Sequence, residues 1–327
     1  MNVGLTYDLR SDYLKEGYTL EETAEFDKEE TIDGIEAALI ENGYKTHRIG
    51  NARHLMKALM SGKKWDIVFN ICEGMYGDSR ESLVPALLDA YKIPHVFSGA
   101  VTLGISLNKA FAKRIIRDAG ILTPDFCVVS VPEDVENCHL PYPLFAKPVA
   151  EGTGKGIEGK SIINNKKELA ETCRDLLTKY NQPVIVEDFL PGREFTIGVV
   201  GNVSSAKVVG GMEIIYTPQA GNIYSYFNKE NYKDLINYIP VEGKLLEECG
   251  EVTLNVWKAL EACDGGRVDL RMDKEGRINF LEINPLAGLN PIHSDLPILA
   301  RFNGISYTQL IGEIMKAAIN RISGKNE

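Results

Sequence analysis

Apolar positions in the first hundred residues alternate between short runs and segments with helical spacing. They predict strands at residues 3–7, 46–49 and 65–72 and helices at residues 29–42, 52–60 and 82–91. This alternation indicates a parallel sheet with crossover helices, in which ligands gather at the carboxyl ends of the strands. We therefore expect the loops after residues 7 and 72 to contact a ligand.

The loop after residue 72 carries two candidates for substrate contact, Glu73 and Arg80. The alternative is that Arg80 and the adjacent Glu81 only begin the helix at 82–91. The spacing of apolar residues then predicts a helix over 106–119, in which Lys109 and Lys113 share one face at i, i+4. From the residues alone, these two lysines form a solvated basic stripe.

A glycine-rich segment, residues 151–159, follows a short apolar strand at 142–148. Its glycines have the spacing of a dinucleotide-binding fingerprint, but residues 160–163 read as a strand, whereas that motif must open a helix. It is not a Walker A loop, because Lys155 is followed by Gly156 rather than by Ser or Thr. The segment therefore reads as a hairpin loop whose N–H groups, with the Thr153 hydroxyl, can close over phosphates. A mobile turn is the alternative.

The next segments alternate again: a helix at 167–180, a buried strand at 184–186 and an alternating strand that ends near residue 199. An extended backbone beside apolar side chains suits an adenine edge, and Glu194 is placed for ribose hydroxyls. Short strands and a tyrosine-rich loop are expected between 203 and 245, and helices at 245–263 and 307–322.

The segment 266–290 predicts a β-hairpin, because Val268, Leu270 and Met272 alternate with polar residues before a turn at 273–276. By alternation, Arg267 and Asp269 share a face with Glu282 and Asn284 of the second strand. Leu281 and Ile283 should point to the core on the opposite face. Two carboxylates and an amide oxygen suit Mg²⁺, and Arg267 could neutralise an oxyanion. A merely solvated polar face is the alternative.

Composition narrows the class of protein. A chain of 327 residues with 44% hydrophobic content is expected to form two or three packed units. Its net charge of -10 gives no general affinity for nucleic acid or anionic membranes. The spacing of the six cysteines supports neither a zinc site nor a disulfide framework, and no segment resembles a leader or a membrane span. The expected compartment is the cytoplasm.

The ordered set of Lys109, Lys147, the glycine loop, the Glu187 corner and the hairpin resembles the ATP-grasp enzymes, and among them the D-alanine:D-alanine ligases. The likeness covers nearly the whole chain and is strongest at 105–200 and 265–310. It implies an ATP-grasp fold of α/β and α+β parts: an N-terminal parallel-sheet substrate domain (1–105), a central lid domain (106–200) and a C-terminal domain with the metal and catalytic hairpin (201–327). It also implies an ATP-dependent ligase that forms peptide bonds through an acyl phosphate, uses one or two Mg²⁺ or Mn²⁺ ions and forms a homodimer.

The resemblance also implies a role for each matching residue. The nucleotide contacts would come from Lys109, Lys147, Gly152, Thr153, Gly154, Lys155, Gly156, Glu187, Asp188, Phe189, Leu190 and Glu194. Asp269, Glu282 and Asn284 match the metal ligands, while Arg267, Gly288 and Lys229 match the catalytic groups. Glu73, Arg80, His293 and Ser294 match the substrate contacts, with one residue inserted before His293.

Three departures from the ligase pattern fall where amino acids would bind. Glu73-Gly74 stands where the ligases usually have His-Gly, the first loop (7–26) is longer and more charged, and Gly154 replaces a Ser. We therefore expect a substrate other than free D-alanine. The alternatives are a ligase for other amino acids or a natural-product acid, and a non-catalytic nucleotide-binding protein. The latter would be expected to lose some of the hairpin residues, all of which are present.

Overall fold

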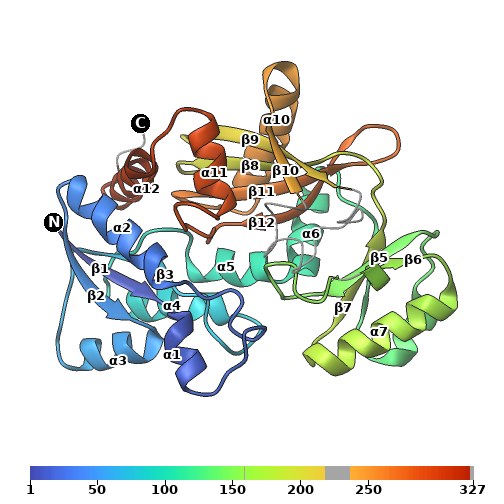
Figure 1. Ribbon diagram of the computed structural model, residues 1–327, viewed down its shortest axis with the longest axis horizontal. Helices are drawn as coiled ribbons and strands as arrows, with labels where there is room; N and C mark the ends of the chain where they lie inside the picture. The colour runs from blue at the N-terminus through green and yellow to red at the C-terminus, as the bar shows by residue number, and fades with distance from the viewer. Residues whose placement is uncertain (158, 218–235, 325–327) are drawn as a thin grey trace.

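The computed structural model describes residues 1–157, 159–217 and 236–324, and their strands form three sheets (Figure 1). In the first sheet, β1 (Asn2–Tyr7) lies between β2 (Lys45–Gly50) and β3 (Ile67–Ile71), and all three strands are parallel. Helices α2 (Glu29–Glu41) and α3 (Ala52–Met60) connect them, and α4 (Leu83–Ala90) follows β3. The predicted parallel sheet is therefore confirmed.

The N-terminal sheet shares its hydrophobic core with the end of the chain. Helix α2 packs on α12 (Tyr307–Ile322), and Figure 1 shows these two helices side by side. One buried cluster contains Leu5 and Phe69 from the sheet together with Ile311 and Ile314 from α12. The first and last parts of the chain are thus held together by burial of apolar surface.

The second sheet is antiparallel, in the order β10-β9-β8-β11-β12. Its strands are β8 (Glu194–Val200), β9 (Lys207–Tyr216), β10 (Ile236–Pro240), β11 (Gly265–Met272) and β12 (Ile278–Asn284). Helix α10 (Gly243–Ala259) buries Trp257 against the sheet, and α11 (Asp295–Phe302) packs on β8 and β9. A Cβ at Gly198 would lie 2.4 Å from Leu299 Cδ1, so the close approach of α11 requires glycine there.

The third sheet has the order β4-β7-β5-β6 and is covered by α7 (Lys166–Tyr180). Its strands are β4 (Phe126–Val129), β5 (Leu144–Pro148), β6 (Ile162–Ile163) and β7 (Val184–Asp188). Strands β5 and β6 are antiparallel, which confirms the predicted hairpin around the glycine-rich loop. The expectation of unpaired cysteines is wrong for two of them: a disulfide joins Cys127 to Cys138, because the fold brings β4 beside the segment after it.

Short elements join the sheets: α1 (Arg10–Lys15), α5 (Ala100–Leu107), α6 (Lys109–Asp118) and the 3-10 turns η1 (Arg80–Ser82), η2 (Pro132–Asn137) and η3 (Gly159–Ser161). The helix predicted at 106–119 begins later, at Lys109. Its N-cap is Asn108, whose side chain accepts hydrogen bonds from the N–H groups of Ala110 and Phe111. The domain boundaries at 105 and 200 stay a prediction. Strand β8 ends at residue 200 and pairs with β9 and β11, so the second sheet draws strands from both sides of the predicted boundary at 200.

The catalytic hairpin contains a β-bulge that the sequence pattern does not reveal. Asp269 pairs with Glu282, but the next residue, Leu270, pairs with Phe280, so Leu281 is an extra residue on β12. The prediction that Leu281 points to the core with Ile283 is therefore wrong. Phe280 takes that core position, whereas Leu281 lies beside Glu282 on the wall of a cavity.

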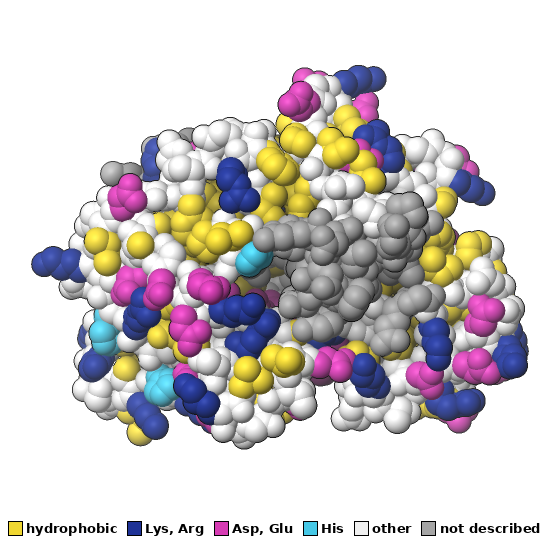
Figure 2. All heavy atoms as spheres, in the orientation of Figure 1, with side chains coloured by type: hydrophobic (Ala, Val, Ile, Leu, Met, Phe, Trp, Pro, Cys, Tyr) yellow, Lys and Arg dark blue, Asp and Glu magenta, His cyan; other side chains and the backbone are white. Residues whose placement is uncertain are grey.

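The surface is mixed in charge. Figure 2 shows acidic and basic side chains interspersed over one face of the molecule. Among the described helices, none is both long and apolar enough to cross a membrane.

Candidate active site

The hairpin β11–β12 presents four polar side chains on one face. Arg267 pairs across the strands with Asn284, and Asp269 with Glu282. The Arg267 guanidinium forms an ion pair with Asp269 and lies 3.7 Å from a carboxylate oxygen of Asp295, while the Asn284 amide donates to Asp269 at 3.3 Å. The shared face predicted from alternation is therefore present. It is largely buried rather than solvated, since Arg267 and Asp269 are each 8% exposed.

The two hairpin carboxylates differ in proton affinity. Burial raises the pKa of Asp269 to about 6, although Arg267 opposes the shift. Burial would also raise the pKa of Glu282, but the charges of Lys109, Lys147 and Arg267 outweigh it and hold that pKa at about 2. Glu282 is thus a carboxylate at any physiological pH.

The lysines at 109 and 113 do not form a solvated stripe, because both side chains are buried. Lys109 Nζ donates to the Glu151 carbonyl at 2.5 Å and lies 3.4 Å from Glu282. Lys113 Nζ lies 3.0 Å from Glu187 and donates to Thr123 Oγ1 at 2.9 Å. Helix α6 packs on β12, so its basic face is turned into the protein.

Glu187 lies between two cations. Its carboxylate is 2.9 Å from Lys147 and 3.0 Å from Lys113, and the residue is 3% exposed. Burial lowers the pKa of Lys113 to about 8, against the pull of Glu187, whereas the carboxylates around Lys147 outweigh burial and raise the pKa of Lys147. Sequence reasoning missed Lys113, although its i, i+4 spacing from Lys109 was a usable signal.

A small cavity of about 90 Å³ holds most of the predicted nucleotide residues. Its lining includes Lys109, Lys147, Gly152, Gly154, Lys155, Glu187, Asp188, Phe189, Leu190, Glu194, Asp269 and Glu282. Glu194 accepts hydrogen bonds from the Tyr216 hydroxyl at 2.7 Å and from Arg271 at 3.0 Å. Arg271, which also lies over the Phe189 ring, was missed; it continues the alternation of Arg267 and Asp269 along β11.

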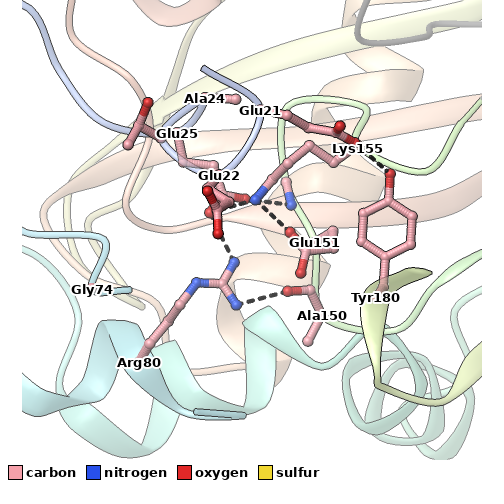
Figure 3. A network of polar contacts seen from close by, with 12 residues as sticks. Glu21, Glu22, Ala24, Glu25, Gly74, Arg80, Ala150, Glu151, Lys155 and Tyr180 are labelled. Carbon is pink, nitrogen blue, oxygen red and sulfur yellow. Dashed lines mark hydrogen bonds and ion pairs between the residues drawn. The ribbon is translucent and has the colours of Figure 1, made fainter. Parts of the chain in front are cut away.

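The glycine-rich loop folds against the first loop of the chain. Gly152 N–H donates to Glu25 at 2.6 Å, and Lys155 forms ion pairs with Glu151 and Glu25. Figure 3 shows Glu25 between Lys155 and Arg80. Thr153, Gly154 and Gly156 have positive φ, and a Cβ at Gly156 would lie 2.5 Å from the Pro148 ring, so the turn requires glycine there.

A larger cavity of about 470 Å³ adjoins these groups. It brings Glu73, which follows β3, together with Arg267, Gly288, His293 and Ser294 from the C-terminal part, and it also includes Lys109, Gly152, Thr153, Glu282 and Asn284. Arg80 is not among its lining residues within the described chain. Instead, its guanidinium donates to Glu25 at 2.9 Å and to the Ala150 carbonyl at 2.8 Å, as Figure 3 shows. Lys229 lies outside the described residues.

Sequence reasoning missed Glu25 and Asp27 on the wall of the larger cavity, and it named Glu81 only as the possible start of a helix. Glu25 lies in the first loop (7–26), Asp27 directly follows it, and Glu81 directly precedes the helix predicted at 82–91. The positions of these segments depend on the packing of the whole chain.

Comparison with known proteins gives one consistent family. Residues 115–316 match the family model described as the D-ala D-ala ligase C-terminus. The chain is 33% identical over 287 residues to a D-alanine--D-alanine ligase of Aquifex aeolicus, which covers 87% of this chain and 93% of that protein. It shares its fold with the ATP complex of a D-alanine--D-alanine ligase from Bacillus anthracis (TM-score 0.75, 22% identity, 100% of both chains). The same fold occurs in the VanG D-Ala:D-Ser ligase of Enterococcus faecalis (TM-score 0.72, 19% identity, 97% of this chain and 99% of that one).

Proposed function

We propose, because this chain belongs to the D-alanine–D-alanine ligase family of ATP-grasp enzymes, that it joins the carboxylate of one amino acid to the amine of a second and converts ATP to ADP and phosphate. The observation that carries this proposal is the larger cavity. Its wall includes Lys109, the glycine loop and Glu282, which suit phosphates, as well as Arg267 and Gly288, which suit a reacting carboxyl group. Nucleotide phosphates and amino acids can therefore meet in one cavity.

The donor set of the hairpin fits Mg²⁺. Asp269 and Glu282 supply carboxylate oxygens from directly opposite positions, and the Asn284 amide, which donates to Asp269 through its nitrogen, keeps its oxygen for a cation. The hairpin set has only two carboxylates, and the described part of the chain contains no cluster of three or more His, Cys, Asp or Glu side chains that could hold a metal. Two carboxylates and an amide leave room for the waters and phosphate oxygens that Mg²⁺ prefers. When bound, the ion would neutralise charge on the phosphates of ATP.

The first chemical step activates a carboxylate, which is a poor electrophile. A carboxylate oxygen attacks the γ-phosphorus of ATP, the bond from that phosphorus to the bridging oxygen breaks, and ADP leaves as an acyl phosphate forms. Lys109 and Lys147 offset the negative charge that spreads over the transferred group. The glycine loop lies beside the same phosphates, and its N–H groups other than those of Gly152 and Lys155, which donate to Glu25 and to the Gly152 carbonyl, can close over them.

The second step forms the amide bond. The neutral amine of the other substrate attacks the acyl carbon, and the oxyanion of the tetrahedral intermediate is stabilised by Arg267 and the Gly288 N–H. A Cβ at Gly288 would lie 2.9 Å from Ser294 Oγ, so a side chain there would displace this hydroxyl, one of the proposed substrate contacts. The C–O bond to phosphate breaks as the amide forms, and the departing phosphate takes up the proton that the amine nitrogen loses. No covalent enzyme nucleophile is needed.

The proposal is tested by measuring ADP release with ATP and Mg²⁺ across a panel of D- and L-amino acids and dipeptides, with mass spectrometry of the product. When isotope-labelled ATP is incubated with one acid alone, the label should exchange between the bridging and non-bridging oxygens of the β-phosphate, because acyl phosphate formation is reversible. Binding of ATP without ADP release or exchange on any substrate would favour a non-catalytic nucleotide-binding protein.

The residues at the cavity wall bear on the identity of the two amino-acid substrates. D-Alanine is the substrate named for the relatives, but Glu73 stands at the cavity wall where a neutral or basic residue would favour a carboxylate. We therefore favour a ligase for another amino acid, and a small natural-product acid is the second candidate. High kcat/KM for two D-alanines would contradict this preference.

We also propose that the enzyme works as a homodimer in the cytoplasm, with small molecules as its substrates. Light scattering tests the dimer. Disulfides persist chiefly in oxidising compartments, so alkylation of free thiols at cell lysis tests the location. A fully formed disulfide between Cys127 and Cys138 in cells would contradict the cytoplasmic location.

A further inference from the structure

One wall of the larger cavity carries carboxylates that form no ion pair with the described residues. Glu73 follows β3, and Glu81 lies in the turn η1. Both line the cavity, and neither carboxylate forms a hydrogen bond or ion pair with any residue in the described ranges. Asp27, on the same wall, accepts a hydrogen bond from Thr31.

The neighbouring cations are already engaged. The Arg80 guanidinium binds Glu25 and the Ala150 carbonyl (Figure 3). Lys109 binds the Glu151 carbonyl and pairs with Glu282. Against the effect of burial, the charge of Arg80 lowers the pKa of both Glu73 and Glu81, but within the described residues its guanidinium is held by Glu25 and forms an ion pair with neither of them.

Burial and neighbouring carboxylates raise the proton affinity of the carboxylates on this wall. Burial, followed by the charges of Glu81, Glu25 and Asp27, raises the pKa of Glu73 well above its ordinary value. Burial raises the pKa values of Glu81 and Asp27 to about 7. A cation bound against this wall would remove the repulsion between the carboxylates.

A second feature of the same cavity points to a ligand with hydrogen-bond donors. Ser106, on α5, is 6% exposed, and its hydroxyl has no partner within the described residues although it lines the cavity. Helix α5 packs on η1, which carries Glu81. An ammonium group has three donors and no acceptor, so two carboxylates and a hydroxyl are matched to it.

We propose that one of the two amino acids joined here carries a second cationic group on its side chain, held by Glu73, Glu81 and Ser106. This inference rests on the proposed ligase function. The α-ammonium of the activated amino acid can bind one of the two carboxylates. The attacking amine must be neutral, so it cannot supply a cation for the other. The other carboxylate is then left for a cation on the side chain of a substrate, which makes a diamino acid the expected class.

The test compares charged substrates with neutral ones of similar shape. ADP release is measured with the D- and L-forms of 2,3-diaminopropionate, 2,4-diaminobutyrate, ornithine and lysine, each offered alone and with alanine, and with norvaline, norleucine and citrulline as neutral counterparts. At least one diamino acid should exceed its neutral counterpart in kcat/KM by about tenfold or more, the size expected when one charge-assisted hydrogen bond is made.

Two variants locate the effect. Glu81→Gln and Glu73→Gln should each remove most of the preference for the diamino acid and leave the KM for ATP within about twofold, since such a loss concerns only the charged contact. The matched control is Glu30→Gln, an exposed carboxylate of α2 outside the cavity, which should keep the preference. Retention of the preference in both cavity variants would overturn the assignment.

The outcomes separate this inference from the proposed function. If neutral amino acids are joined as well as or better than every diamino acid, the inference is wrong and the ligase function stands. If no substrate releases ADP, the ligase function fails, and the inference is then decided by binding. A diamino acid should raise the Tm of the wild type and not that of Glu81→Gln, and the absence of any such rise would refute it.

Discussion

The replacement of Glu81 by Gln should stabilise the protein in the absence of substrates, and only at neutral to alkaline pH. Burial raises the pKa of Glu81 from 4.5 to about 7. A group with a raised folded-state pKa contributes its full stability below the unfolded pKa and loses it as pH rises through the folded one. Glutamine resembles the protonated form at every pH. Wild type and variant should therefore differ little at pH 5 and diverge by pH 8.

The expected size follows from the shift. About 2.5 pKa units at 1.36 kcal/mol each give roughly 3 kcal/mol at pH 8 in favour of Glu81→Gln. With an unfolding entropy of about 2.1 cal/mol/K per residue, this corresponds to a rise in Tm of about 4–5 °C for a chain of 327 residues. Removing this charge also lowers the repulsion on Glu73, which acts in the same direction.

The assay is thermal unfolding by fluorescence between pH 5 and pH 8.5, without ATP, Mg²⁺ or amino acids. Glu30→Gln, which removes an exposed carboxylate, should follow the wild type within about 1 °C, as surface changes usually do. The reasoning is refuted if Glu81→Gln is no more stable than the wild type at pH 8, or if its advantage is the same at pH 5.

Three further predictions concern the hairpin, the buried lysine and the glycine loop. Glu282→Gln should keep the fold but raise the Mg²⁺ concentration needed for activity and reduce ADP release by orders of magnitude; wild-type release at ordinary Mg²⁺ would exclude a metal role. Lys113→Met should lower the free energy of unfolding by about 3 kcal/mol in urea, because Glu187 loses one of two buried partners, whereas exposed Lys57→Met should change it by under about 0.5 kcal/mol. Proteolytic cleavage within residues 152–156 should slow when a non-hydrolysable ATP analogue binds; equal cleavage in both states would count against phosphate contact.

Local pattern was sufficient for most elements. The parallel direction of β1, β2 and β3 follows from alternating strand and helix signals, and the antiparallel pair β5–β6 follows from two apolar runs around a glycine-rich loop. The shared face of Arg267, Asp269, Glu282 and Asn284 also follows, because side chains two apart in a strand point the same way. Each of these properties depends on residues close together in the chain.

The bulge in β12 marks the limit of that reasoning. Alternation assigns Leu281 to the core, but one extra residue on β12 shifts the register and brings Leu281 to the cavity beside Glu282. The pairing partner β11 decides this, and the spacing within β12 carries no sign of it.

The chain by itself determined the chemistry available: the lysines, the glycine loop and the carboxylates of the hairpin, with an ordered spacing that identifies their family. Only the tertiary structure decided which of these charges meet. Lys113 is buried because α6 packs on β12 and brings it to Glu187, and Glu25 reaches Gly152 across 127 positions of the chain. The acidic wall of Glu73 and Glu81 likewise exists only once the N-terminal sheet and α5 enclose a cavity with the hairpin, because burial and proximity, which depend on packing, set the energy of a charge.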